Sequence, residues 1–221
     1  MKIEDRIIVA LDVSNLDKAK KLIKTLWPRV KFFKIGLEMI NIGQAPELIE
    51  YIHNLGGRVF YDIKLNDVPN TVGRAAEVIS NLGVQMFTVH ASAGRDSVRA
   101  AVKNKGRSNI VGVTILTSLT GRDTRDKVIK FSKMLKQEGV HWVVCSSRES
   151  RVLKELGLKV IIPGIRPSWT NQNEQKRVAT PREAFKNGAD YIVIGRPITN
   201  PAKEIGGPKK ALVRIIEEIE N

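Results

Sequence analysis

The chain alternates short β-type runs with amphipathic helical stretches eight times, and this alternation limits the fold more than any other feature. The β-type runs have near-continuous apolar interiors, which is typical of parallel strands covered on both faces. They occupy residues 6–11, 30–35, 59–64, 84–89, 110–116, 142–145, 160–164 and 191–195. The helical stretches occupy residues 16–26, 44–55, 70–82, 94–104, 123–138, 147–156, 181–187 and 201–219.

Eight consecutive β–α units predict an α/β fold, a closed (β/α)8 TIM barrel rather than an open sheet. The 221 residues suit a single domain over residues 1–221, with short loops, because such barrels typically need about 250 residues. Residues 166–180 form the only long irregular stretch, which we interpret as an active-site loop after the seventh strand. Glycines suited to left-handed caps follow four helices, at Gly56, Gly83, Gly139 and Gly188.

The composition indicates the cellular compartment of the protein and the kinds of partner that it binds. A single cysteine, Cys145, allows no intramolecular disulfide and fits a reducing cytosol. No early apolar run resembles a signal peptide, and no stretch has the roughly 20 apolar residues of a membrane helix, so we expect a cytoplasmic protein. The net charge of +14 is spread over every helical stretch among Asp and Glu, which favours a solvated surface that attracts an anionic small substrate over nucleic-acid binding.

Charged residues gather where the first three strands end, which is where a TIM barrel carries its active site. Asp62 and Lys64 are two residues apart, so they share a strand face, and Asp67 follows in the next loop. Asp12 and Lys34 end the first and second strands. An ion-pair network that seals the barrel is the alternative, but the convergence on one rim favours catalysis. Lys64 among carboxylates should stay protonated, which suits a proton donor more than a nucleophile.

The seventh and eighth strands end in similar glycine–arginine turns. Arg166 ends the run Pro-Gly-Ile-Arg, and Arg196 follows Gly195 directly. Glycine lets backbone N–H groups approach an anion, arginine supplies a forked donor, and barrels commonly bind phosphate at these two loops. The turns therefore predict a phosphate site, with two ordinary strand-end turns as the alternative.

The run Asp-Ile-Lys-Leu-Asn-Asp-Val-Pro-Asn-Thr, residues 62–71, closely resembles the signature of orotidine 5′-phosphate decarboxylases. The resemblance covers essentially the whole chain, in order and at strand ends. It includes residues 10–12, 33–36, 89–91, 116–118, 163–166, 175–181 and 193–196.

The resemblance implies decarboxylation of orotidine 5′-phosphate to UMP and CO2, in de novo pyrimidine biosynthesis. Lys64 would protonate C6 of the pyrimidine, and Asp62 would lie against the departing carboxylate. Lys34 and Asp67 would complete an alternating Lys-Asp-Lys-Asp array. Asp67 and Thr71 would reach into the partner subunit's site, which makes the enzyme a homodimer with shared active sites.

The resemblance also implies the remaining ligand contacts. Asp12 and Lys34 would hold ribose hydroxyls, and Thr117 would bond the pyrimidine. The phosphate would be held by Gln175, the backbone at Gly195, Arg196 and, closing the loop, Arg166. The family needs no metal and no organic cofactor.

Two other functions remain open from the residues. A sugar-phosphate decarboxylase or aldolase that uses Mg²⁺ and an enediolate also carries an Asp-x-Lys-x-x-Asp run. The continuation to Thr71 and residues 175–181 favour the nucleotide enzyme, and residues 88–91 offer no additional carboxylate for magnesium. A basic barrel that binds nucleic acid or a scaffold is the third candidate, but it leaves the pairing of Asp62 with Lys64 unexplained.

Overall fold

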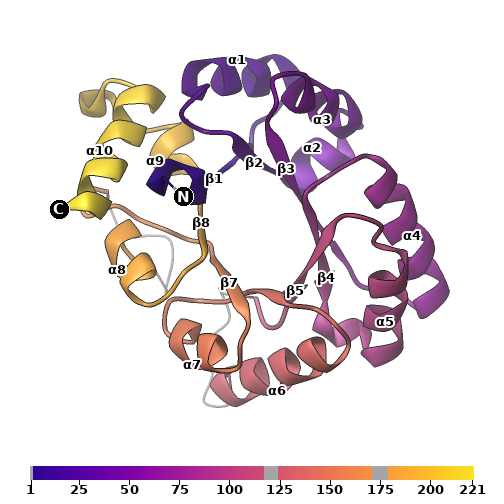
Figure 1. The fold of residues 1–221 in the computed structure, drawn as a ribbon. Helices are drawn as coiled ribbons and strands as arrows, with labels where there is room; N and C mark the ends of the chain where they lie inside the picture. The colour runs from indigo at the N-terminus through magenta and orange to yellow at the C-terminus, as the bar shows by residue number, and fades with distance from the viewer. Residues whose placement is uncertain (1, 117–123, 171–178) are drawn as a thin grey trace.

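The computed structural model is a closed barrel of eight parallel strands inside a ring of helices (Figure 1). It describes residues 2–116, 124–170 and 179–221. Each strand pairs with the next in the chain, and β8 pairs with β1 to close the barrel, so the predicted TIM barrel is confirmed. The strands are β1 Ile7–Ala10, β2 Phe32–Ile35, β3 Arg58–Leu65, β4 Met86–His90, β5 Asn109–Val113, β6 Trp142–Val144, β7 Lys159–Ile162 and β8 Tyr191–Ile194.

The helices that cover the barrel follow the predicted stretches closely. They are α1 Leu16–Leu26, α2 Leu37–Asn41, α3 Ala45–Asn54, α4 Pro69–Asn81, α5 Arg95–Asn104, α6 Thr124–Gln137, α7 Ser150–Glu155, α8 Pro181–Lys186, α9 Arg196–Thr199 and α10 Pro208–Glu220. The described residues also include three short 3-10 helices, η1 Ile3–Arg6, η2 Ala91–Ala93 and η3 Lys203–Ile205.

Two differences from the predicted helices have local causes. The predicted helix over residues 201–219 is wrong at its start, because Gly206 and Gly207 have φ of 81° and 102° and no helix can run through them. The chain there forms η3 and only then α10. The short helices α2 and α9 were not predicted, because four or five residues are too few to show a helical period.

Side chains of the strands alternate between the barrel interior and the helices. One cluster of buried residues fills the interior, and a much larger cluster lies between sheet and helices. On β3, Phe60 belongs to the interior, whereas Ile63 and Leu65 pack against the outer cluster. Asp62 and Lys64 therefore share the inward face, as the two-residue spacing predicts.

The described parts of the predicted active-site loop are anchored at both ends. Ile165 forms an isolated bridge with Ala179, and the amide of Arg166 donates to the carbonyl of Ala179. Thr180 then begins α8 with a capping box, in which Thr180 and Glu183 each accept from the other's backbone N–H. The four predicted glycine caps all have positive φ, between 73° and 94°.

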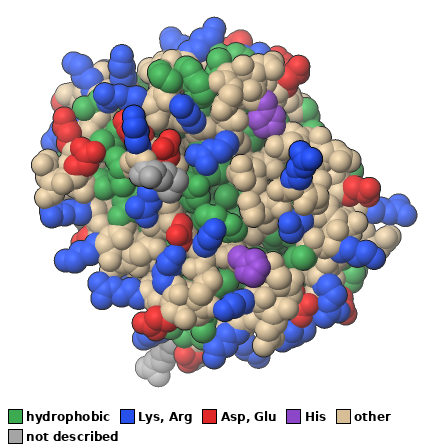
Figure 2. Space-filling view, in the orientation of Figure 1, with side chains coloured by type: hydrophobic (Ala, Val, Ile, Leu, Met, Phe, Trp, Pro, Cys, Tyr) green, Lys and Arg blue, Asp and Glu red, His purple; other side chains and the backbone are tan. Residues whose placement is uncertain are grey.

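The basic residues are scattered rather than collected into one patch. Figure 2 shows Lys and Arg side chains over the whole visible face, with Asp and Glu between them. Several are paired, such as Arg95 and Arg99 with Glu138. In the described part of the chain, no helix combines the length and the apolar character that crossing a membrane requires.

Candidate active site

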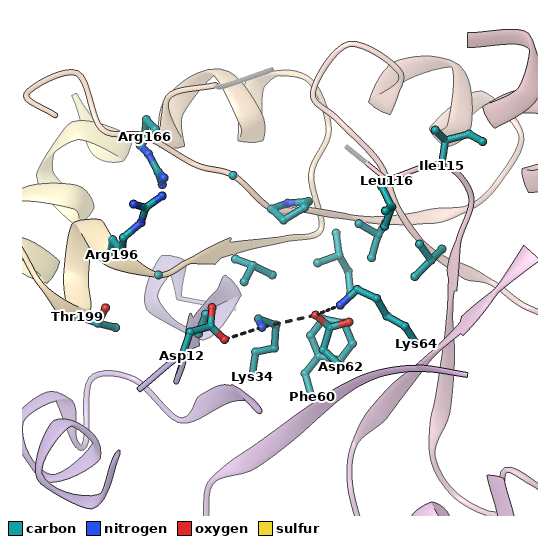
Figure 3. Close-up of a pocket in the computed structure, with 18 residues that line it drawn as sticks. Asp12, Lys34, Phe60, Asp62, Lys64, Ile115, Leu116, Arg166, Arg196 and Thr199 are labelled. Atoms are coloured by element: carbon teal, nitrogen blue, oxygen red, sulfur yellow. Dashed lines mark hydrogen bonds and ion pairs between the residues drawn. The ribbon is translucent and has the colours of Figure 1, made fainter. Parts of the chain in front are cut away.

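A cavity of about 340 Å³ opens at the carboxyl ends of the strands (Figure 3). This volume falls in the range of small-molecule sites. Its walls combine charged side chains with an apolar surface that includes Phe60, Ile115 and Leu116. The polar side chains that line it are Asp12, Lys34, Asp62, Lys64, Arg166, Arg196 and Thr199.

Four of these side chains form a continuous charged row across the cavity (Figure 3). Lys34 Nζ lies 3.1 Å from Asp12 Oδ1 and 3.5 Å from Asp62 Oδ2. Lys64 Nζ lies 2.9 Å from the same Asp62 oxygen. Three neighbouring strands thus supply an Asp–Lys–Asp–Lys row, in which each ammonium contacts a carboxylate. Of the five charged residues that the sequence places on this rim, the structure joins these four in one row, and Asp67 is not part of it.

Asp62 is the electrostatic centre of the row. Its side chain is only 14% exposed, and burial by itself raises the pKa of a carboxyl group. The charges of Lys34 and Lys64 and hydrogen bonds from Lys64 and Thr88 outweigh burial, so the pKa of Asp62 is lowered below its ordinary value. Asp62 is therefore ionised at neutral pH and holds both lysines beside it.

Lys64, whose side chain lines the cavity, lies in a β-bulge of β3. Tyr61 pairs with Phe87 and Leu65 with Val89, so the three residues between them on β3 lie opposite Thr88 alone. Within this bulge Lys64 adopts a φ of 58°, a left-handed conformation that non-glycine residues rarely take. Strain of this kind persists where the surroundings hold it, and it gathers at functional sites.

Gly36 leaves the space that the Lys34–Asp12 pair occupies. A Cβ atom added at Gly36 would lie 2.9 Å from both Lys34 Nζ and Asp12 Oδ1. Real Cβ atoms essentially never approach other heavy atoms so closely, so any side chain here displaces one or both partners. The glycine after β2 is thus part of the geometry of the charged row.

The opposite end of the cavity carries the two predicted arginines. Figure 3 shows the guanidinium groups of Arg166, from the loop after β7, and Arg196, from the start of α9, pointing toward each other. Gly195 lines the cavity between this pair and the row, and a Cβ there would lie 4.0 Å from Asp12 Oδ2. The cavity is therefore polarised, with the arginines toward Asp12 at one end and Lys64 at the other.

Two predicted residues, Asp67 and Thr71, do not line this cavity. Both are exposed: Asp67 lies in the loop before α4, where its Oδ1 accepts from the amide of Val68, and Thr71 lies in the first turn of α4. Thr117 and Gln175 fall in residues 117–123 and 171–178, outside the described residues. A single chain therefore assembles Asp12, Lys34, Asp62 and Lys64 without Asp67.

Sequence reasoning missed several residues that shape the site. Phe60 lines the cavity from the same inward face as Asp62, and Thr199 lines it from α9. Thr88, on β4, is fully buried and bonds both Asp62 and Lys64. Alternation along β3 was the available signal for Phe60, because it lies two residues from Asp62 and shares its face, whereas no comparable signal points to Thr88 or Thr199.

Within the described ranges, no group of three or more His, Cys, Asp or Glu side chains is placed to hold a metal ion.

The closed barrel, with acid–base side chains at the ends of its first three strands, places the chain in the class of (β/α)8-barrel enzymes. Residues 5–206 match the family model described as "Orotidine 5'-phosphate decarboxylase / HUMPS family", and the chain belongs to this family.

Several proteins similar to this chain carry the name orotidine 5'-phosphate decarboxylase. The orotidine 5'-phosphate decarboxylase of Syntrophomonas wolfei subsp. wolfei is 40% identical, with 100% of both chains covered. That of Heliobacterium modesticaldum is 35% identical over 99% of this chain and 97% of its own. Among solved structures, orotidine 5'-phosphate decarboxylase from Lactobacillus acidophilus superimposes with a TM-score of 0.81 at 29% identity, covering 98% of this chain and 100% of its own.

Proposed function

We propose that this protein decarboxylates orotidine 5′-phosphate to UMP and CO2, in de novo pyrimidine biosynthesis. The observation that carries the proposal is the Lys64 ammonium held 2.9 Å from Asp62 in a cavity that ends in paired arginines. The polarity of the cavity matches the order of groups in a nucleotide. A phosphate at the arginine end and a ribose beside Asp12 and Lys34 would leave the base at Lys64.

Lys64 is the proposed proton donor to C6. Loss of CO2 from C6 leaves a carbanion whose electron pair lies in the ring plane, where the ring π-system cannot absorb it. The available stabilisation is electrostatic, and an ammonium fixed about 3 Å away provides it before donating its proton. The Asp62 carboxylate supports this role because its hydrogen bond with Lys64 restricts where the Lys64 Nζ lies.

Asp62 is also proposed to lie against the substrate carboxylate. Two negative groups in close contact would raise the energy of the bound substrate, and departure of CO2 would relieve it. The buried, ionised state of Asp62 supports this assignment. Since each factor of ten in rate requires about 1.4 kcal/mol, one such contact is insufficient alone, and the ammonium at Lys64 remains the larger contribution.

The remaining binding roles follow the same orientation. Arg166, Arg196 and the backbone at Gly195 are proposed to hold the phosphate, together with Gln175. Two facing guanidinium groups support this, because arginine supplies forked donors that suit the oxygens of a phosphate. Thr117 is proposed to bond the pyrimidine.

The working enzyme is proposed to be a homodimer that shares its sites. Residues 66–71 are six consecutive exposed residues beside the cavity rim, and Val68 among them is 61% exposed. This exposed run leaves its side chains accessible to a second copy of the chain. Asp67 and Thr71 lie in this run, so they are proposed to complete the partner subunit's site.

The proposal includes the conditions under which the enzyme works. Catalysis is assigned to side chains alone, with neither metal nor organic cofactor and without nucleic acid as a partner. A cytoplasmic location is proposed, supported by the single buried cysteine. One domain over the whole chain is also proposed, supported by α10 packing back onto α1 and α8 of the barrel.

The test is a spectrophotometric assay of orotidine 5′-phosphate with excess EDTA. The expected result is loss of pyrimidine absorbance, with UMP as product, at a rate that added Mg²⁺ does not change. A folded sample without turnover would contradict the proposal. Turnover of a sugar phosphate that requires Mg²⁺ would instead favour the aldolase-type alternative.

A further inference from the structure

Thr88 lies on β4, opposite the bulge in β3 that contains Asp62 and Lys64. It is fully buried, on the inward face of β4 above Met86, at a position where an apolar β-branched residue would pack without any polar group to satisfy. A buried hydroxyl is unfavourable unless it is hydrogen-bonded. The hydroxyl of Thr88 makes two hydrogen bonds, one with the Lys64 backbone and one with the Asp62 side chain, and both residues belong to the bulge in β3.

The first hydrogen bond replaces a missing backbone contact. Thr88 stands alone opposite three residues of β3, and the amide of Lys64 donates to Thr88 Oγ1 over 2.7 Å. The Thr88 side chain thus satisfies the Lys64 N–H, which the backbone hydrogen bonds between β3 and β4 leave unsatisfied. Because this amide belongs to the residue with φ of 58°, the bond helps to hold the strained conformation that directs Lys64 into the cavity.

The second hydrogen bond orients the carboxylate that pairs with Lys64. Thr88 Oγ1 donates to Asp62 Oδ1 over 3.1 Å, whereas Asp62 Oδ2 contacts Lys64 Nζ and Lys34 Nζ. One carboxylate oxygen is therefore fixed by the hydroxyl and the other by the lysines. The same hydroxyl links the Lys64 backbone to the Asp62 side chain.

We propose that Thr88 is a positioning residue, whose hydroxyl sets the relative placement of Asp62 and Lys64. It does not line the cavity, so it acts through these two residues and not on the ligand. This inference rests on the proposed decarboxylation as far as rates are concerned. Its effect on Asp62 does not depend on any reaction.

The kinetic test compares Thr88→Val with Thr88→Ser. Valine keeps the shape and removes both hydrogen bonds, whereas serine keeps the hydroxyl. The expected result is a fall in kcat of about 10- to 100-fold for the valine variant, with KM and UMP affinity within about threefold. The serine variant should recover most of kcat. A catalytic effect without a binding effect separates positioning from general damage.

Thr114→Val is the matched control. Thr114 is also a buried threonine, just after β5, but its hydroxyl makes no hydrogen bond with any described residue. The same substitution there should leave kcat unchanged. A comparable loss in Thr114→Val, or an equal loss in Thr88→Ser, would overturn the proposal, as would wild-type kcat in Thr88→Val.

A substrate-free measurement separates this proposal from the proposed function. Carbon-13 NMR titration, with the Asp62 signal assigned by Asp62→Asn, should show a higher pKa for Asp62 in Thr88→Val than in wild type or Thr88→Ser. If wild type does not decarboxylate, this comparison still decides the role of Thr88. An unchanged Asp62 pKa overturns it. If Thr88→Val does not fold, Thr88→Ala replaces it, and failure of both overturns positioning in favour of a purely structural role.

Discussion

Among the described residues, Lys64 is the only non-glycine with a positive φ, and it is also the residue to which the chemistry is assigned. A regular β3 would pair amide by amide with β4. In the bulge the Lys64 amide instead donates to Thr88, while the Lys64 Nζ lies 2.9 Å from Asp62 Oδ2. Strain in one backbone residue, held by its neighbours, thus produces an ammonium with a fixed direction.

Gly36 offers a test of how tightly the charged row is packed. Gly36→Ala should lower kcat/KM at least tenfold, because the new Cβ displaces Lys34 Nζ or Asp12 Oδ1 from the row. Its free energy of unfolding should change by less than about 1 kcal/mol, since the atoms displaced are the ends of side chains and the backbone φ of −101° suits alanine.

Steady-state kinetics and urea unfolding measure the two quantities on the same sample. Undiminished kcat/KM in a folded Gly36→Ala variant would show that the row tolerates movement at Lys34 and Asp12. A large loss of stability would assign Gly36 to the fold instead of to the site.

His90 ends β4 near the row, and its protonation should destabilise the protein. Burial lowers the pKa of His90, and the nearby charge of Lys64 lowers it further against the opposing effect of Asp62. Below about pH 6.5 the unfolded chain therefore binds a proton more readily than the folded one. Stability is full above this value and falls as the pH drops through the pKa of folded His90.

Urea unfolding of wild type and His90→Gln at pH 8 and pH 5 measures this effect. The loss of unfolding free energy between the two pH values should be smaller in the variant. The corresponding loss from Asp62, whose pKa is also lowered, begins only below its ordinary value of 3.8 and lies outside this range. An equal loss in both proteins would contradict the account of His90.

At the scale of elements, the sequence predicts regular structure well and its interruptions poorly. Helix α1 has the predicted bounds of residues 16–26, because its apolar period and its Asn15 cap are both local signals. The bulge in β3 depends on register against β4, which no local pattern specifies. Asp62 and Lys64 were therefore predictable as site residues, whereas Thr88 and the left-handed Lys64 were not.

The capping box of α8 gives a prediction at this scale. Thr180→Ala removes the side-chain oxygen that accepts from the Glu183 amide, so it should lower the free energy of unfolding by about 1 kcal/mol. Thr25→Ala is the control, since its exposed hydroxyl only donates to the Lys21 carbonyl within α1, and it should change stability by less than about 0.5 kcal/mol. Equal effects in urea unfolding would contradict the capping role.

At the scale of the whole molecule, the closed barrel brings distant segments to one rim. The arginines after β7 and β8 lie next to the row from β1 to β3 because β8 pairs with β1. The alternation of strands and helices, with the charges at the strand ends, made this convergence on one rim predictable from the sequence. What one chain does not reveal is a second copy, so the place of Asp67 and Thr71 remains a prediction.

Shared sites predict complementation between two inactive variants. When Lys64→Ala and Asp67→Ala subunits are mixed and allowed to exchange, half of the dimers are mixed, and each contains one intact site. Activity should then recover to about a quarter of the wild-type value. Activity assays, with subunit exchange verified by native mass spectrometry, provide the measurement. No recovery after verified exchange would contradict shared sites.

The central claim is that the Lys64 ammonium carries the chemical step, and kcat of Lys64→Ala tests it most directly. With orotidine 5′-phosphate saturating and UMP binding retained, kcat should fall by a factor of at least about 10³, because the proton donor and its charge are both lost. The exposed Lys24→Ala variant should keep wild-type kcat. A Lys64→Ala enzyme that turns over at the wild-type rate would contradict the account.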